Sequence, residues 1–229
     1  MTERLEAALF GLLMLVLVWA PLPFASNRVW GGGLLAVLVG LILAVWLVLL
    51  LGSRARLPAQ TWQAARLPLL LLCLVQLWVL VQLLPLPRPL VAWLSPQAFA
   101  WHIDSGWLSL SLDTAATRYY LLRGCTLVAV FFLVLALVNS PRRLRLMLQV
   151  LVFSGTFQAL YGSFMVLSGL ELGFFVEKYA GHGVATGTFV NRNHLAGYLV
   201  MCLAAGIGLL MSQQAGQSSP LWKERLRRL

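Results

Sequence analysis

The residues best suited to chemistry lie just before the last long apolar run of the chain. They form the sequence Asn191-Arg192-Asn193-His194. An asparagine directly before an apolar run is a good helix N-cap, and arginine can hold phosphate oxygens through two parallel hydrogen bonds. A helix N-terminus with an adjacent arginine also favours an anion. The spacing therefore predicts an anion-binding helix start, with Asn193 as its N-cap.

Each of these side chains also has a purely structural interpretation. Asn193 could serve only as a cap, and Asn191 could hold the loop through backbone hydrogen bonds. Arg192 could extend to lipid headgroups, and His194 could be a wet residue at the membrane surface. The residue types alone leave both interpretations open.

Three more polar residues are candidates for binding a ligand. Lys178 and His182 lie in the segment before the Asn-Arg-Asn-His sequence. Arg123 lies about one turn inside a predicted span, where a charge is costly and usually faces a cavity or a partner.

The composition indicates which elements must position these residues. Of the 229 residues, 60% are hydrophobic and 10% are charged, whereas soluble domains carry about 25% charged residues. Several runs without Asp, Glu, Lys or Arg approach the roughly 20 residues that a helix needs to cross a bilayer. We predict an all-α, polytopic integral membrane protein with about six transmembrane helices, over residues 5–25, 30–51, 67–86, 119–139, 146–170 and 194–211.

These spans define a membrane domain over 1–211, followed by a basic tail or inner loop over 212–229. Residues 87–118 and 171–193 are the predicted outer segments, and residues 141–144 form a predicted inner turn. In the first outer segment, recurring tryptophans favour a helix over 90–101 lying on the membrane. The alternation over 107–113 favours a short extended piece, and Asp113 is the predicted N-cap of the next span.

The net charge of +10 is distributed loop by loop and not over one surface. With the N-terminus inside, every inner loop is basic, as the positive-inside rule expects. We therefore predict that both termini are cytoplasmic and that nucleic acid is not a partner. The outer Lys and Arg residues are then Arg28, Arg88, Arg118, Arg123, Lys178 and Arg192.

The cysteines and the N-terminus carry structural predictions. Cys73, Cys125 and Cys202 are odd in number and not at metal-binding spacing, so we predict buried apolar side chains, no disulfide framework and no metal. The segment 1–6 carries one Arg and two Glu, which is a poor start for a signal peptide. The first apolar run is therefore predicted to be an uncleaved span.

The segment from Gly187 to Tyr198 resembles the hallmark motif of the bacterial O-antigen ligase and O-antigen polymerase superfamily. In that family a Gly-Thr-Phe is followed by a pair of asparagines, an Ala-Gly and a membrane helix. This chain has Gly187-Thr188-Phe189, then Asn191 and Asn193, then Ala196-Gly197. Residues 109–123, with Ser-Leu-Asp and Ala-Thr-Arg, are similar to the family's segment before its next helix.

The resemblance implies a multi-pass glycosyltransferase of the bacterial inner membrane. Its donor would be a glycan on undecaprenyl diphosphate, and its acceptor a lipid or another glycan, with no metal and no cofactor. A base would deprotonate the acceptor hydroxyl, and cations would stabilise the departing diphosphate. The candidate substrate- and diphosphate-binding residues are Arg192, Asn191, Asn193, His194, Arg123, Lys178 and His182.

The chain departs from the family pattern at two places. Val184-Ala185-Thr186 stand where an arginine often precedes the Gly-Thr-Phe. Nothing in 212–229 resembles the family's later segment, where the catalytic base is expected. We therefore expect this chain to be either the N-terminal half of a longer protein, with its catalytic base downstream of Leu229, or the product of a truncated gene, and in both cases to be inactive alone.

Two other classes of function compete with this interpretation. One is a transporter or flippase of polyprenyl-linked glycans, which would more often show Gly- or Pro-broken spans in two halves. The other is a non-catalytic membrane scaffold, which has no need for Asn, Arg, Asn and His together at a helix start. The sequence leaves the acceptor, the glycan and the choice between ligase and polymerase open.

Overall fold

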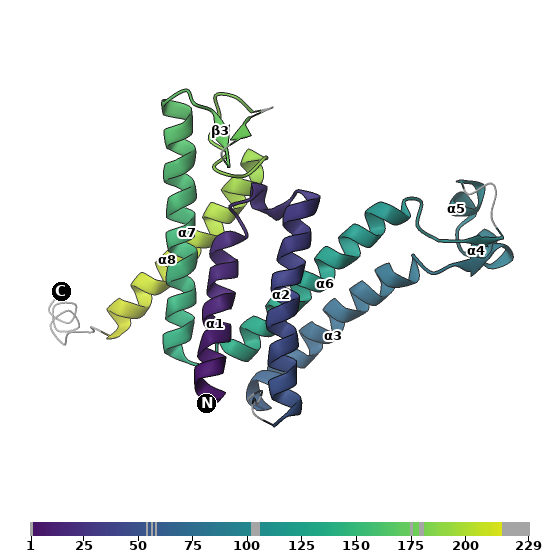
Figure 1. Ribbon diagram of the computed structural model, residues 1–229, viewed down its shortest axis with the longest axis horizontal. Coiled ribbons are helices and arrows are strands. Elements are labelled where there is room, and N and C mark those ends of the chain that lie inside the picture. The colour runs from purple at the N-terminus through teal and green to yellow at the C-terminus, as the bar shows by residue number, and fades with distance from the viewer. Residues whose placement is uncertain are drawn as a thin grey trace, which may run out of the picture. The chain divides into compact units, whose positions relative to one another are not determined.

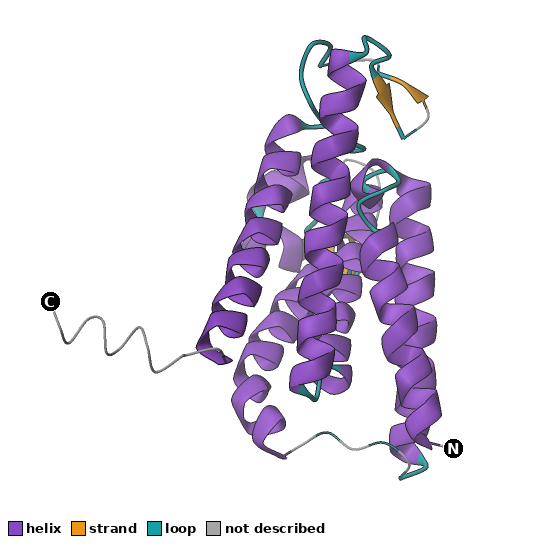
Figure 2. Ribbon diagram, turned by 90° about the vertical axis from the view of Figure 1, so that its left-hand side faces the viewer, coloured by secondary structure: helices purple, strands orange, loops and turns teal. Residues whose placement is uncertain are grey.

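The computed structural model describes residues 2–53, 55, 57, 59–101, 106–174, 176–178 and 181–216, and these residues are mostly helical (Figure 1). The long helices are α1 (Thr2–Trp19), α2 (Val29–Leu51), α3 (Ala59–Val81), α6 (Thr114–Leu137), α7 (Pro141–Leu167) and α8 (Arg192–Gly216). The strands of the described part form two short antiparallel ladders (Figure 2). The prediction of a helical, multi-pass membrane protein is confirmed in this coarse form.

Five of the described helices are long and apolar enough to cross a bilayer, namely α2, α3, α6, α7 and α8. Only 11% to 28% of the most apolar window of each helix is buried inside the protein. Exposed leucine and valine on this scale are unfavourable in water but suit a helix whose solvent is lipid.

The first helix does not join that set. Its 18 residues include Glu3, Arg4 and Glu6, and its apolar part from Ala7 is about 20 Å long at 1.5 Å per residue. A bilayer core is about 30 Å thick. The helix ends at Trp19 and not at 25, because Pro21 and Pro23 follow and proline breaks the backbone ladder of a helix. The span count of six therefore stays a prediction.

The chain divides into two compact units. The first unit comprises Met1–Leu13 and Gly32–Leu137. In it α3 packs on α6, and Trp46 of α2, 1% exposed, meets Phe132 of α6 edge to face at 5.1 Å between ring centroids. Two short helices, α4 (Arg88–Leu94) and α5 (Pro96–Trp101), and the ladder of β1 (Leu86–Pro87) with β2 (Trp107–Leu108) connect α3 to α6.

The second unit comprises Met14–Gly31 and Val138–Leu229. It pairs α7 with α8 and carries a hairpin of β3 (Leu172–Gly173) and β4 (Val176–Glu177). It also contains the turn η1 (Phe24–Ser26). The two long helices approach closely because Gly155 has no side chain: a Cβ there would lie 2.5 Å from the Cβ of Cys202.

Several helix boundaries differ from those predicted. α3 begins at Ala59 and not near residue 67, and α7 begins at Pro141, where a turn was predicted. Ser140 caps α7 by accepting a hydrogen bond from the Arg143 N–H at 3.3 Å, and proline suits the first position of a helix. The predicted N-cap Asp113 is confirmed, since its carboxylate accepts from the Ala116 N–H at 2.9 Å.

Three further sequence predictions have mixed outcomes. The helix predicted over 90–101 is two helices, separated at Ser95. The extended piece predicted over 107–113 is present only in part, as β2 over Trp107–Leu108. Cys202 is buried, as predicted, but Cys73 and Cys125 are exposed on their helices, so the prediction of burial is wrong for them. Of the predicted tail 212–229, α8 covers the part up to Gly216, and 217–229 lie outside the described residues.

Candidate functional site

The residues 187–191, here called the motif loop, are fastened to α7 by a buried amide. Gln158 of α7 is fully buried. Its Oε1 accepts a hydrogen bond from the Thr188 N–H, and its Nε2 donates to the Thr188 hydroxyl, both at 2.9 Å. The Thr188 hydroxyl donates in turn to the carbonyl of Pro21 at 2.6 Å. A buried polar group without a partner is costly, so this fully paired set fixes the loop in one position.

Two glycines let the motif loop approach the backbone of α7. Gly187 has a positive φ of 57°, and a Cβ there would lie 2.5 Å from the Oε1 of Gln158. A Cβ on Gly162, in the helix, would lie 2.8 Å from the Gly187 nitrogen. Any other residue at either position would push the loop away from the helix. The conformation of the loop thus depends on glycine at both 162 and 187.

The start of α8 is capped by Asn191 and not by Asn193. The Asn191 side chain accepts a hydrogen bond from the Asn193 N–H at 2.8 Å, and its carbonyl accepts from the N–H groups of His194 and Leu195. The prediction that Asn193 is the cap is therefore wrong, and the interpretation of Asn191 as a backbone-holding residue is confirmed. These bonds occupy the N–H groups of the first turn beyond Arg192.

The motif loop leaves three side chains exposed at the start of the helix. Arg192, Asn193 and His194 are all exposed, whereas Thr186, Gly187, Thr188 and Phe189 just before them are buried. No hydrogen bond or ion pair with another described residue engages the side chains of these three. The structure therefore separates a buried, fastened part of the motif from an exposed polar part.

Lys178 closes the loop that leads to the motif. Its ammonium group donates to the Glu171 carboxylate at 2.6 Å and to the Val184 carbonyl at 3.0 Å. The other Glu171 oxygen accepts from the Gly183 N–H at 2.7 Å. The hydrogen bond from Lys178, followed by that from Gly183, holds the pKa of the Glu171 carboxyl below its usual range. Lys178 is half-buried in this clasp, and its charge is already neutralised.

His182 sits at the tip of the same loop, between Gly181 and Gly183, and is exposed. Both glycines have a positive φ, 74° and 73°, which favours glycine over other residues. His182 is therefore carried on a tight turn that the Glu171–Lys178 clasp closes.

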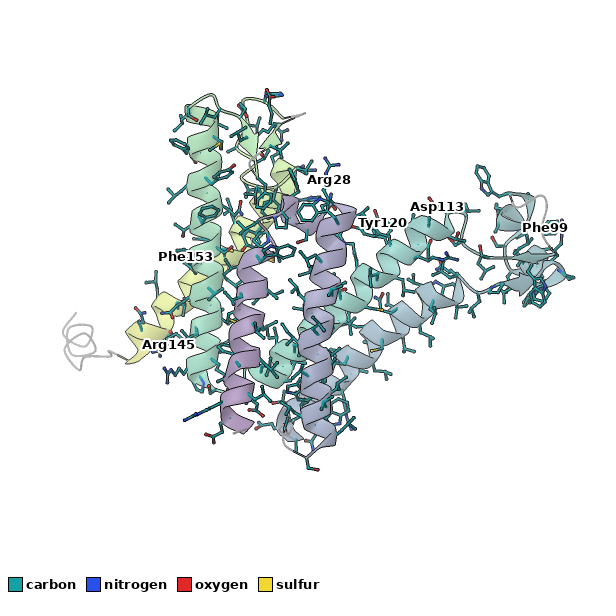
Figure 3. All side chains as sticks on the ribbon, in the orientation of Figure 1. Arg28, Phe99, Asp113, Tyr120, Arg145 and Phe153 are labelled. Atoms are coloured by element: carbon teal, nitrogen blue, oxygen red, sulfur yellow. The ribbon has the colours of Figure 1, made fainter. Side chains whose placement is uncertain are left out.

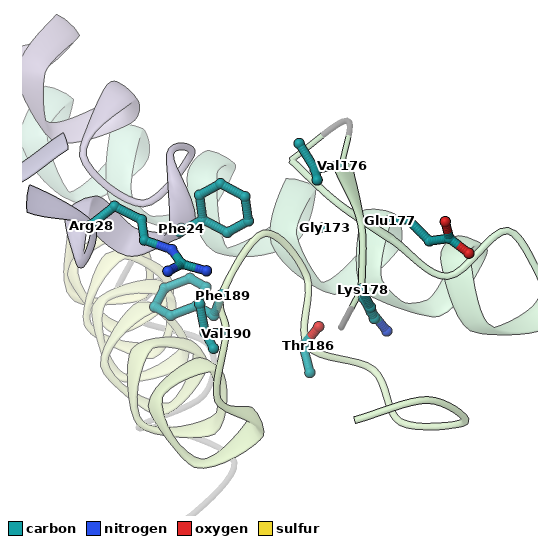
Figure 4. Close-up of a pocket in the computed structure, with 9 residues that line it drawn as sticks. All are labelled: Phe24, Arg28, Gly173, Val176, Glu177, Lys178, Thr186, Phe189 and Val190. Carbon is teal, nitrogen blue, oxygen red and sulfur yellow. The ribbon is translucent and has the colours of Figure 1, made fainter. Parts of the chain in front are cut away.

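A small cavity lies beside the motif loop, between it and the turn after α1 (Figure 4). Its volume is about 60 Å³, and its lining includes Phe24, Arg28 and Phe189. The Arg28 guanidinium lies 5.7 Å from the ring centroid of Phe24, and Figure 4 shows it beside Phe189 as well. A cavity needs roughly 10–15 Å³ of such space to hold one water molecule, so this cavity is large enough for water.

Arg123 belongs to the first unit, in α6, and is half-buried. Its guanidinium lies 5.7 Å from the ring centroid of Tyr119, one turn nearer the start of the helix. The Arg123 side chain thus extends toward the N-terminal end of α6. The other six candidate residues all lie in the second unit, Asn191 to His194 together at one helix start and Lys178 and His182 on the loop before it.

Sequence reasoning missed the residues that fasten the motif. Gln158 and Gly162 were part of an apolar run, and Pro21 marked only the end of a span. A glutamine in the middle of an apolar run was the available signal, because an amide in the membrane needs a partner. Its partner Thr188 is 30 residues away, which no local pattern reveals.

Comparisons with known protein families, with curated proteins and with solved structures find no match for this chain. The helices and their apolar surfaces define a multi-pass membrane protein. Its function must be argued from the site itself.

Proposed function

We propose that this chain is a membrane glycosyltransferase of the O-antigen ligase and polymerase type. It would transfer a glycan from an undecaprenyl diphosphate donor to a lipid or glycan acceptor at the periplasmic face of the bacterial inner membrane. One observation carries the proposal: the motif loop is fastened to α7 through Gln158, while Arg192, Asn193 and His194 stay exposed at the start of α8. A scaffold has no need for this combination of a fixed backbone and an exposed polar cluster.

The chemistry follows from the charges at that helix start. A departing diphosphate gains negative charge, and a fixed cation beside it lowers the barrier. Arg192 is that cation, because its planar guanidinium matches two phosphate oxygens. The positive end of the α8 dipole adds to the attraction. The hydrogen bonds of the first turn are already made within the motif, so the ligand would meet side chains more than backbone N–H groups.

The loop residues divide into two roles under this proposal. Asn193 and His194 are exposed beside Arg192 and would orient the donor. Lys178 would act differently, because its ammonium group is already held by Glu171 and Val184. We assign Lys178 to shaping the loop and His182 to contacting the glycan from the loop tip. Arg123 would contact the donor only if its guanidinium left the Tyr119 ring when the donor binds.

The orientation belongs to the same proposal. Both termini would be cytoplasmic, and the motif loop would face the periplasm, as the loop charges indicate. A reporter active only in the cytoplasm, fused after Arg145 or Leu229, should give signal, and one fused after Trp107 or Lys178 should give none. Signal from the fusion after Lys178 would disprove the six-span topology.

The test of function is glycan transfer by the full gene product in membranes, at matched expression. Arg192→Gln removes charge-assisted hydrogen bonds worth about 1.5–3 kcal/mol, so transfer should fall roughly 10- to 150-fold. Arg192→Lys keeps the charge but loses the planar fork, so its loss should be smaller. Asn193→Asp places a carboxylate beside the diphosphate and should also impair transfer.

Two further variants serve as controls, one for folding and one for transfer. Asn191→Asp retains a good N-cap, so its effect on helix formation should be small, and it is compared for folding only because its carboxylate would also lie beside the diphosphate. Arg118→Gln removes another exposed arginine near the start of a long helix, and transfer should be unaffected. Full activity of both Arg192→Gln and Asn193→Asp would show that the motif only starts α8 and binds no donor, and would refute the proposal.

A further inference from the structure

The segment between α3 and α6 folds into a small module with its own core. We call residues 86–101 and 106–110 the outer module; Figure 1 shows α4 and α5 beyond the ends of α3 and α6. Its core is Val91, Ala98 and Leu108, each no more than 1% exposed, with Phe99 and Leu110 among the residues packed against it. The β1–β2 ladder pairs Leu86 with Leu108. A segment predicted as one surface helix is thus a defined unit of structure.

The apolar residues left outside this core are large and include three indoles. Trp93, Trp101 and Trp107 are 78%, 69% and 64% exposed. Leu90 and Leu94 are also exposed, and their helical spacing places them on the same face of α4 as Trp93. Tryptophan buries more area than most side chains, so leaving three of them in water would be unfavourable.

Charge is nearly absent from the same surface. Across residues 84–101 and 106–112, Arg88 is the single Asp, Glu, Lys or Arg. Its guanidinium lies 5.2 Å from the ring centroid of Phe99 (Phe99 is labelled in Figure 3). A module facing water would normally carry about one charged residue in four. The surface therefore has the composition of one that leaves water.

Short connections hold the module close to the ends of two helices that can cross a bilayer. Four residues separate Val81 of α3 from Leu86, and at about 3.5 Å per residue they span at most about 17 Å. The Ser111 N–H donates to the Gln82 carbonyl at 3.0 Å, which joins the two connections at their base. The exposed apolar surface also continues onto Leu84 and Leu112, 44% and 55% exposed. The module is thus continuous with the lipid-facing surface of α3 and α6.

We propose that the outer module docks on the phospholipid bilayer, with the indole rings of Trp93, Trp101 and Trp107 in the headgroup layer. Indole prefers this layer because its ring is apolar and its N–H can still reach water or a headgroup. The module then sets the depth of the outer ends of α3 and α6. This inference rests on the membrane-spanning helices and is independent of glycan transfer.

The test measures which solvent each position meets. The full chain, with Cys73, Cys125 and Cys202 replaced by alanine, receives one cysteine in place of Trp93, Trp101 or Trp107. Each variant is labelled with an environment-sensitive fluorophore and placed in vesicles of phosphatidylcholine and phosphatidylglycerol. Quenching by nitroxide-bearing lipid is compared with quenching by aqueous iodide. Glu177→Cys is the control, because Glu177 is an exposed charged residue of β4, outside the outer module.

The expected result is a blue-shifted emission at all three positions, quenched severalfold more by lipid nitroxide than by iodide. Position 177 should show the reverse ratio. The proposal is overturned if any of the three tryptophan positions is quenched by iodide as strongly as position 177. It is equally overturned if any of them is shielded from both quenchers, since a protein contact would then cover it. Loss of activity in the Arg192 variants has no bearing on either outcome.

Discussion

Replacing Gln158 by leucine should release the motif loop without emptying the core. Leucine has a similar volume but no amide, so the main loss is the pair of hydrogen bonds to Thr188, each 2.9 Å long. The Thr188 N–H then lies buried without an acceptor, because Thr188 is 2% exposed. Its hydroxyl still has the Pro21 carbonyl. The helix α7 itself should remain intact.

An unpaired buried polar group costs about 1–3 kcal/mol, so the open form of the loop should become roughly 5- to 150-fold more populated. Thr188→Val should have an effect of the same order, because it leaves the buried Gln158 amide N–H without its acceptor, although the Pro21 carbonyl keeps the hydrogen bond from the Ala25 N–H. The two changes break the same hydrogen bond. The double variant should therefore fall short of additivity by about 0.5–3 kcal/mol.

The assay is the rate of tryptic cleavage after Arg192 in protein embedded in lipid nanodiscs. Cleavage there requires the start of α8 to open, and its rate follows the open population when opening and closing are fast. Gln149→Leu is the control, since Gln149 is exposed on the same helix. Equal cleavage rates for Gln158→Leu and Gln149→Leu would show that the buried amide does not hold the loop.

Three other perturbations have defined outcomes. Gly187→Ala should lower the free energy of unfolding more than Gly183→Ala. Both glycines have a positive φ, but of the two only Gly187 would place a Cβ within 4 Å of another atom, at 2.5 Å. Comparable losses of unfolding free energy in a detergent titration would contradict this prediction. Because the folded pKa of Glu171 is lowered, its stabilisation of the loop is present at neutral pH and is lost as the pH falls through that lowered pKa. Tryptic cleavage of the loop, or hydrogen exchange where trypsin is inactive, should therefore rise only below the ordinary glutamate range. The rise should be absent in the Glu171→Gln/Lys178→Met double variant. Arg123→Leu should lower glycan transfer while expression and membrane insertion stay normal; wild-type transfer would mean that Arg123 only extends toward the membrane surface.

The sequence predicted the helices well where an apolar run and a helix coincide. The run 30–51 became α2, Val29–Leu51. The sequence-based prediction failed where a helix extends beyond its apolar run. The polar residues Gln60 and Arg66 belong to α3 although they lie outside that run. Run length reports the lipid-embedded part of a helix, and the rest depends on caps. The capping signal of Ser140 and Pro141 was present, but it was interpreted as a turn.

The candidate site was predicted in part for a related reason. The exposed polar cluster is local in sequence, so the motif could be located before the structure was known. The N-cap is Asn191 and not the predicted Asn193, because α8 starts at Arg192. The apolar run from which the helix was predicted begins only after His194. Lys178 was expected to be available to a ligand but is bound by Glu171, seven residues away. Ion pairs across a hairpin depend on register, which loop composition does not reveal.

The hydrogen bond between Pro21 and Thr188 also sets an order of events during biosynthesis. Its partners are 167 residues apart, and at about 5–20 residues per second the ribosome needs roughly 8–33 s to synthesise that length. Throughout this interval the local partner of the Pro21 carbonyl is the Ala25 N–H, which donates to it at 3.1 Å. The turn after α1 can therefore reach its final bonding only after α7 and the motif loop have been synthesised. A ribosome stalled before codon 188 would leave this end of the unit open to quality-control proteases.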